Sequence, residues 1–253
     1  MNEVVGILLT LLTGSFFIVG GLLIYFFREK NKLIDFATGL AFSVILGLII
    51  FDLLPEITNY FSRIVVGYQF ILIVSLIVSG MVVSKIIDMY IPHHDHDEEI
   101  KHNNHESHLY HIGIVTGLSL LLHNILEGTI IYLTTLTGRK EGLILAIGVA
   151  AHNIPMGMQI YASLKEGRAN LKQRILMMIL LVFSGVIGAI IMLLFHNNIN
   201  NLVLGSLMAF TVGILIYILA FELSAELFSN KKKMSSIVGI ICGIILVVIS
   251  LIL

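Results

Sequence analysis

The chain has 253 residues, of which 57% are hydrophobic and only 12% are charged, and its formal net charge at pH 7 is −1. A soluble domain carries about 25% charged residues, so this composition excludes an ordinary soluble protein and indicates an integral membrane protein. The near-neutral charge gives no sign of a nucleic-acid partner. The single cysteine, Cys242, excludes a disulfide framework and a thiolate cluster.

Apolar stretches of membrane-spanning length recur along the whole chain. A spanning helix needs about 20 mostly apolar residues, and eight stretches meet that length: residues 4–27, 33–54, 67–90, 112–136, 142–164, 174–195, 202–227 and 234–253. Their nearly continuous apolar content favours helices over a β-barrel. We therefore expect an all-α polytopic membrane protein with eight transmembrane helices, forming one domain over residues 1–253 in the cell membrane.

The basic residues predict the orientation of these spans. Twelve of the fifteen Lys and Arg residues fall on the side of the connections 1–2, 3–4, 5–6 and 7–8, and the other three are Arg63, Arg139 and Lys140. Because connections rich in Lys and Arg stay in the cytoplasm, the odd–even connections are predicted to be cytoplasmic. Both termini are then extracytoplasmic.

Two pairs of acidic residues, each with a spacing of four, lie within the predicted spans. Asp52 and Glu56 flank a Leu-Leu-Pro sequence at the outer end of the second span, and Glu222 and Glu226 lie at the inner end of the seventh. With one pair at each face, they are candidates for the entrance and exit of a cation pathway. Ordinary charges at helix ends are an equally good interpretation.

The connection between the third and fourth spans, about residues 92–111, is the long one. It contains seven of the chain's ten histidines: His93, His94, His96, His102, His105, His108 and His111. Imidazole is the commonest metal ligand, so we interpret this His-rich tract as a disordered cytoplasmic loop that binds metal loosely. A solvated polar linker that binds no metal is the alternative.

A six-residue motif occurs twice inside apolar runs, with its copies 29 residues apart. It reads H-N-I-L-E-G at residues 123–128, in the fourth span, and H-N-I-P-M-G at residues 152–157, in the fifth. Imidazole, carboxamide and carboxylate groups are costly inside a membrane, so a repeated set favours a shared functional site. The alternative is that they only hydrogen-bond one helix to another, worth about 0.6–2 kcal/mol each.

Spacing and depth bring the two copies together. Residues four apart share a helix face, which pairs His123 with Glu127 and His152 with Met156. Both histidines lie about ten residues into their spans, near the bilayer midplane at 1.5 Å per residue. Since the connection between the two spans is short, the helices are antiparallel neighbours. A motif repeated on such helices is what a twofold axis in the membrane plane produces, and secondary transporters bind their substrates at such interfaces.

The chemistry of the motif suits a divalent transition metal. Two neutral imidazoles and one carboxylate favour Zn²⁺ or Fe²⁺ over Ca²⁺ or Mg²⁺. Asparagine amides either add oxygen ligands or hold the ligands in place, and Pro155 frees a backbone carbonyl near Ala151. The candidate metal ligands are His123, Asn124, Glu127, His152, Asn153 and Met156. For the methionine, packing is the commoner role in an apolar span.

With these features the chain resembles the ZIP (Zrt/Irt-like) family of metal transporters over essentially its whole length. The resemblance rests on the eight spans, the His-rich loop, the His-Asn-x-x-Glu-Gly motif, the polar pair followed by Pro-x-Gly, and Leu-Leu-Pro-Glu at residues 53–56. It implies that His123, Asn124 and Glu127 bind metal from the fourth span, and His152 and Asn153 from the fifth.

Two positions depart from the family pattern. Met156 stands where the family usually has an acid or a histidine, and residues 183–189 of the sixth span contain no acid where the family often has a glutamate. Members with all these acids hold two adjacent metals. Because Glu127 is the one central acid of this chain, we expect a single metal and a preference displaced towards softer or more weakly hydrated ions.

The resemblance implies uptake of a divalent metal, Zn²⁺ first and Fe²⁺ second, into the cytoplasm by alternating access. It implies no enzyme activity and no resident cofactor. The expected partners are the metal ion and the lipid bilayer, and the sequence is compatible with a homodimer. Two alternatives stay open: a metal-binding membrane sensor without transport, and an intramembrane metal-dependent hydrolase, for which the chain lacks a His-Glu-x-x-His helix.

Overall fold

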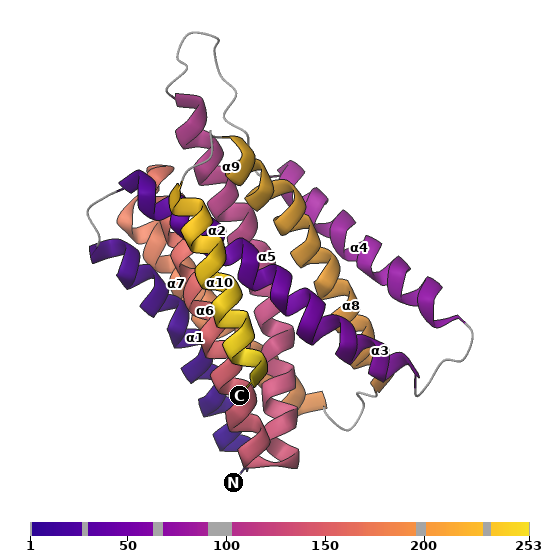
Figure 1. Ribbon diagram of the computed structural model, residues 1–253. Helices are drawn as coiled ribbons and strands as arrows, with labels where there is room; N and C mark the ends of the chain where they lie inside the picture. The colour runs from indigo at the N-terminus through magenta and orange to yellow at the C-terminus, as the bar shows by residue number, and fades with distance from the viewer. Residues whose placement is uncertain are drawn as a thin grey trace.

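The protein is a bundle of long helices (Figure 1). A computed structural model describes residues 2–26, 30–62, 68–90, 103–195, 201–229 and 234–252, and these residues contain no strand. The α-helices are α1 (Asn2–Phe26), α2 (Lys30–Gly47), α3 (Leu54–Ser62), α4 (Gln69–Tyr90), α5 (Asn103–Thr137), α6 (Arg139–Glu166), α7 (Leu171–Phe195), α8 (Asn201–Tyr217), α9 (Ser224–Ser229) and α10 (Met234–Ile252). The all-α prediction is confirmed.

Seven helical segments within these residues are long and apolar enough to cross a membrane. They are Asn2–Phe26, Lys32–Ser62, Gln69–Tyr90, Glu106–Thr137, Arg139–Glu166, Leu171–Phe195 and Asn201–Phe228. They coincide with the first seven predicted spans, so the polytopic architecture is confirmed. The eighth predicted span coincides with α10, whose described apolar stretch, Met234–Ile249, is shorter. Eight spans therefore remain a prediction.

Two of the long helices contain a π-helical segment. Segment η1 (Leu48–Leu53) joins α2 to α3, and η3 (Ile218–Leu223) joins α8 to α9. The first carries Asp52 and the second Glu222, and π segments inside α-helices often occur at functional sites. The helix that carries Asp52 continues to Ser62, so placing Asp52 at the end of the second span was wrong. A hydropathy pattern does not include residues 55–62 in the span, because these last turns of the helix are more polar than the preceding ones.

Helix α5 begins inside the tract that was predicted to be a disordered loop. Residues 103–111 form its first turns, and His111 is buried, so the loop prediction is wrong for this part. An apolar pattern marks only the part of a helix that lies in lipid, and residues 103–111 contain neither glycine nor proline to end the helix earlier. Residues 92–102 lie outside the described part of the chain.

The helices pack in matched pairs. Helix α1 packs on α6 as α7 packs on α5, and α2 packs on α10 as α8 packs on α4; the latter two pairs are visible in Figure 1. A single exchange of spans converts each of these contacts into its counterpart. It exchanges α1 with α7, α2 with α8, α4 with α10, and α5 with α6. This correspondence supports the twofold arrangement that the repeated motif predicts.

The glycine that ends each motif copy allows a close helix contact. A Cβ at Gly128 of α5 would overlap the carbonyl oxygen of Gly185 in α7, and a Cβ at Gly157 of α6 would overlap the carbonyl oxygen of Phe17 in α1. Without a side chain, each helix approaches its neighbour backbone to backbone, as small residues permit in membrane bundles. The two glycines thus fix the positions of the helices that carry the polar residues.

Candidate metal centre

Three predicted ligands meet where α5 contacts α6. The Nε2 atom of His152 donates a hydrogen bond to Oε1 of Glu127 at 2.8 Å, and Nε2 of His123 lies 3.6 Å from the same oxygen. Ligand-type atoms of His123, Glu127 and His152 lie within 4.8 Å of one another, and their side chains are at most 12% exposed. One carboxylate therefore lies between two imidazoles inside the bundle, as the motif spacing predicts.

The local sequence explains this meeting. His123 and Glu127 are one turn apart on α5, and the chain turns back at Gly138, which has an extended backbone, before α6 carries His152 to the same depth. Helix α6 continues through Pro155 as far as Glu166. Because proline has no N–H, the carbonyl of Ala151 loses its usual intrahelical partner. Ala151 lines the same cavity as His152.

The two asparagines of the motif line a separate cavity from the imidazoles. Asn124, Asn153 and Glu127 line a space of about 10 Å³ together with Thr10 and Thr13 of α1. The Nδ2 atom of Asn153 donates to the carbonyl of Thr13 at 3.1 Å, whereas the Asn153 Oδ1 atom and the Asn124 carboxamide have no hydrogen-bond partner among the described residues. Glu127 thus borders both the imidazole cavity and the asparagine cavity.

Met156 lies in the apolar core. Its side chain is 1% exposed and belongs to the same buried cluster as Phe17 and Leu120. The residues that line the three cavities around Glu127, His123 and His152 do not include it. Its role as a metal ligand stays a prediction.

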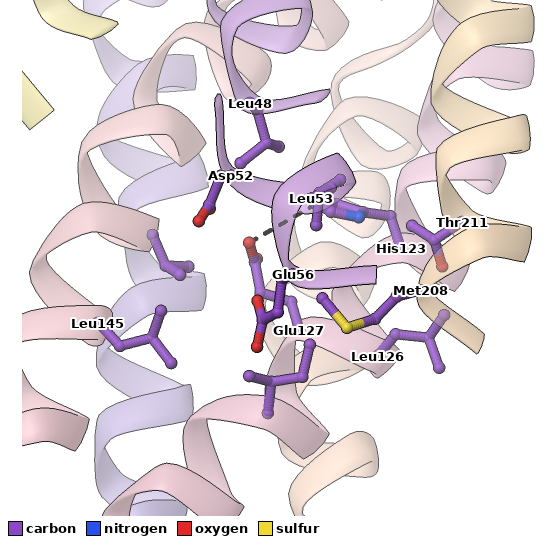
Figure 2. Close-up of a pocket in the computed structure, with 12 residues that line it drawn as sticks. Leu48, Asp52, Leu53, Glu56, His123, Leu126, Glu127, Leu145, Met208 and Thr211 are labelled. Carbon is purple, nitrogen blue, oxygen red and sulfur yellow. Dashed lines mark ion pairs between the residues drawn. The ribbon is translucent and has the colours of Figure 1, made fainter. Parts of the chain in front are cut away.

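Asp52 is a site residue that the sequence prediction placed elsewhere. It lines a cavity of about 40 Å³ with Glu56, His123 and Glu127, and in Figure 2 the three carboxylates face the same space. Asp52 also lines a larger neighbouring cavity, about 260 Å³, that reaches His152 between η1, α6 and α10. The available signal was its position directly before the Leu-Leu-Pro-Glu segment. Its depth depends on η1, which hydropathy does not predict.

A second group of ligand-type side chains was not predicted. Asp88 of α4, His111 of α5 and Glu222 of η3 place such atoms within 4.8 Å of one another, and all three residues are buried. His111 had been assigned to the loop, and Asp88 had received no role. An acid inside an apolar span is a signal of function by itself, but its partners come from helices far away in the sequence.

Comparison with known proteins identifies the family. A family model described as "ZIP Zinc transporter" matches residues 90–251, more than half of the chain. The zinc transporter ZupT of Clostridium perfringens is 27% identical over 279 residues that cover 100% of this chain and 96% of the relative. The proteins of the same name from Oceanobacillus iheyensis and Streptococcus mutans are 28% and 24% identical, covering 100% and 97% of this chain and 98% and 96% of the relatives.

These matches agree with the fold and with the buried imidazole–carboxylate group at the helix contact. They support a multi-pass membrane transporter of divalent metal, and they do not favour the hydrolase or the sensor interpretation. The protein is a transporter and not an enzyme. The chain belongs to the ZIP family of zinc transporters.

Proposed function

We propose that this protein moves Zn²⁺ from outside the cell into the cytoplasm by alternating access, across eight transmembrane helices with both termini outside. The observation that carries the proposal is the convergence of His123, Glu127 and His152 inside the bundle. The relatives named zinc transporter support Zn²⁺ as the first substrate, with Fe²⁺ second. The uneven distribution of Lys and Arg supports the orientation.

The three side chains fit a zinc ion. Zn²⁺ binds imidazole nitrogen and carboxylate oxygen at about 2.0–2.2 Å in tetrahedral geometry, which puts neighbouring ligand atoms about 3.4 Å apart. The two nitrogen-to-oxygen distances of 2.8 Å and 3.6 Å lie on either side of that value. Small movements of these side chains therefore bring the two Nε2 atoms and Oε1 of Glu127 to the spacing of zinc ligands. The metal then takes the place of the His152 ring proton.

Asp52 completes the proposed ligand set. Two neutral imidazoles and one carboxylate leave a bound Zn²⁺ with one uncompensated positive charge, which is costly in a low-dielectric interior. Asp52 lines the same cavity as His123 and Glu127, and its carboxylate makes the site neutral. It also replaces the acid that the family usually has at position 156. We propose that the site holds one metal, and Asn124, Asn153 and Met156 remain proposed ligands.

The cavities support access from outside. The larger one is lined by Phe51 of η1, Ile144 of α6 and Val247 of α10, and it reaches Asp52 and His152. Ile144 precedes His152 by about two turns, in the direction of the α5–α6 turn at Gly138. The charge distribution places that turn outside. A hydrated cation that enters this cavity thus meets Asp52 and His152.

Zinc flux into proteoliposomes tests the proposal. His123→Ala and Glu127→Gln each remove one of the three converging groups, and each should reduce the initial Zn²⁺ uptake rate by about tenfold or more, as expected when a ligand is lost. Glu141→Gln removes an exposed acid of the same helix pair and should keep the wild-type rate. If both site variants transport Zn²⁺ like the wild type, the assigned site is wrong.

A further inference from the structure

Five buried hydroxyl groups have no hydrogen-bond partner among the described residues, and one of them, that of Tyr132, lies beyond Glu127 on the other side of the metal centre. The other four belong to Ser84 of α4, Thr116 and Ser119 of α5, and Thr211 of α8, and each residue is at most 2% exposed. Other buried hydroxyls in the same bundle, such as those of Thr13 and Thr135, donate to a carbonyl of the preceding helical turn. An unpaired polar group inside a membrane protein is costly, so four of them on three neighbouring helices require an explanation.

Three of the four hydroxyls lie on the inner side of the metal centre. Thr211 lies at the level of the centre, where it lines the cavity that contains His123. Ser119 and Thr116 are one and two turns before His123 along α5, and Ser84 is one turn before Asp88 along α4. From His123 to His111, α5 rises about 18 Å. The hydroxyls therefore extend from the metal centre towards the cluster around Asp88.

Asp88 connects α4 to α5 and α8 on the inner side of the metal centre. Its Oδ1 atom accepts a hydrogen bond from Nε2 of His111 at 2.6 Å, and its Oδ2 atom accepts from the Tyr217 hydroxyl of α8 and from Nζ of Lys85, each at 2.7 Å. Both Asp88 and His111 are buried. A charged acceptor with several donors holds its neighbours more strongly than a neutral hydrogen bond does.

Helix α4 has a narrow, fully buried face. Its buried residues are Gly80, Ser84 and Asp88, a narrow stripe at a spacing of four. At Gly80 a Cβ would overlap the carbonyl oxygen of Phe210, so α4 lies directly against α8 there. Apolar side chains of α4, among them Leu72, Leu76 and Ile77, also pack against the core, and the Asp88 bonds add polar contacts to α5 and α8 near the end of α4.

We propose that the four hydroxyls line the inner half of the cation route and that Asp88 is the latch that closes it, an inference that rests on the proposed transport function. When α4 moves away, water and the hydrated cation satisfy the hydroxyls that have no partner in the closed state. A cation that reaches the end of the route competes with Lys85, His111 and Tyr217 for the Asp88 carboxylate. The passing ion itself thereby loosens the latch.

Thiol accessibility tests the latch without requiring transport. In a Cys242→Ser background, Ser119→Cys places a near-isosteric thiol on the proposed route, and a membrane-impermeant thiol reagent is applied to each membrane face in turn. With the latch intact we expect slow labelling from the face where α5 begins. Tyr217→Phe, which removes one donor to Asp88, should raise that rate by about tenfold, as expected for loss of a hydrogen bond to a charged group. Asp88→Asn should raise it further.

Matched controls separate the possible results. Thr135→Cys carries its thiol at a buried position of α5 on the other side of the metal centre, and its labelling from that face should not change with Tyr217→Phe. Equal labelling of Ser119→Cys with and without the latch variants would overturn the inference. His123→Ala, which should reduce flux by about tenfold or more, should leave latch-dependent labelling intact. A failure of the transport proposal is thus distinguishable from a failure of the latch, and the Tyr217→Phe thermal unfolding midpoint confirms that the variant is folded.

Discussion

At the scale of single residues, charge decides what the centre can hold. Glu127 is the one acid between His123 and His152, and the divalent cation needs a second negative charge to be neutral in a low-dielectric site. Asp52 lines the same cavity from a different helix. In the proposed site Asp52 supplies this charge, both attracting the ion and holding it.

The Asp52→Asn variant tests this assignment. Asparagine keeps the shape of the side chain and removes its charge, so we expect the KM for Zn²⁺ uptake to rise about tenfold or more. The measurement is concentration-dependent zinc uptake in proteoliposomes, with Glu141→Gln as the control for removal of an acid at an exposed position. An unchanged KM would remove Asp52 from the site.

At the scale of helices, the sequence predicted which side chains meet where they lie on neighbouring helices. The repeated motif and the short turn between α5 and α6 were enough to predict that His123, Glu127 and His152 meet. Asp52 was displaced in the prediction because its depth depends on a π segment, and the Asp88–His111–Tyr217 contacts join helices that are far apart in the sequence. Periodicity within one helix contains no information about such long-range packing.

The glycine contacts carry a prediction about stability. Gly128→Ala should place a methyl group against the backbone of α7 and destabilise the bundle by about 1–3 kcal/mol, the usual cost of overpacking. Gly185→Ala is the matched control, because its nearest heavy atoms would be 3.7 Å away. Thermal unfolding in detergent should show a lower midpoint for Gly128→Ala alone. Equal midpoints for the two variants would contradict the close-packing role of Gly128.

At the scale of the whole molecule, two matched halves surround the central helix pair. The correspondence of α2–α10 with α8–α4, and of η1 with η3, puts an acid-bearing π segment on each side of α5 and α6. On one side Asp52 lines two cavities, and on the other side Asp88, His111 and Glu222 form a buried cluster. The two related halves therefore differ, and the proposed alternating access requires such a difference to reverse between its two states.

Zinc stoichiometry is the most direct test of the claim that α5 and α6 together hold one cation. The purified protein should carry asparagine in place of the tract histidines His93, His94, His96, His102, His105 and His108, so that loose binding there does not contribute. We predict one tightly bound Zn²⁺ per chain, and none after His123→Ala and His152→Ala are combined. Retention of the zinc by that double variant would contradict the account.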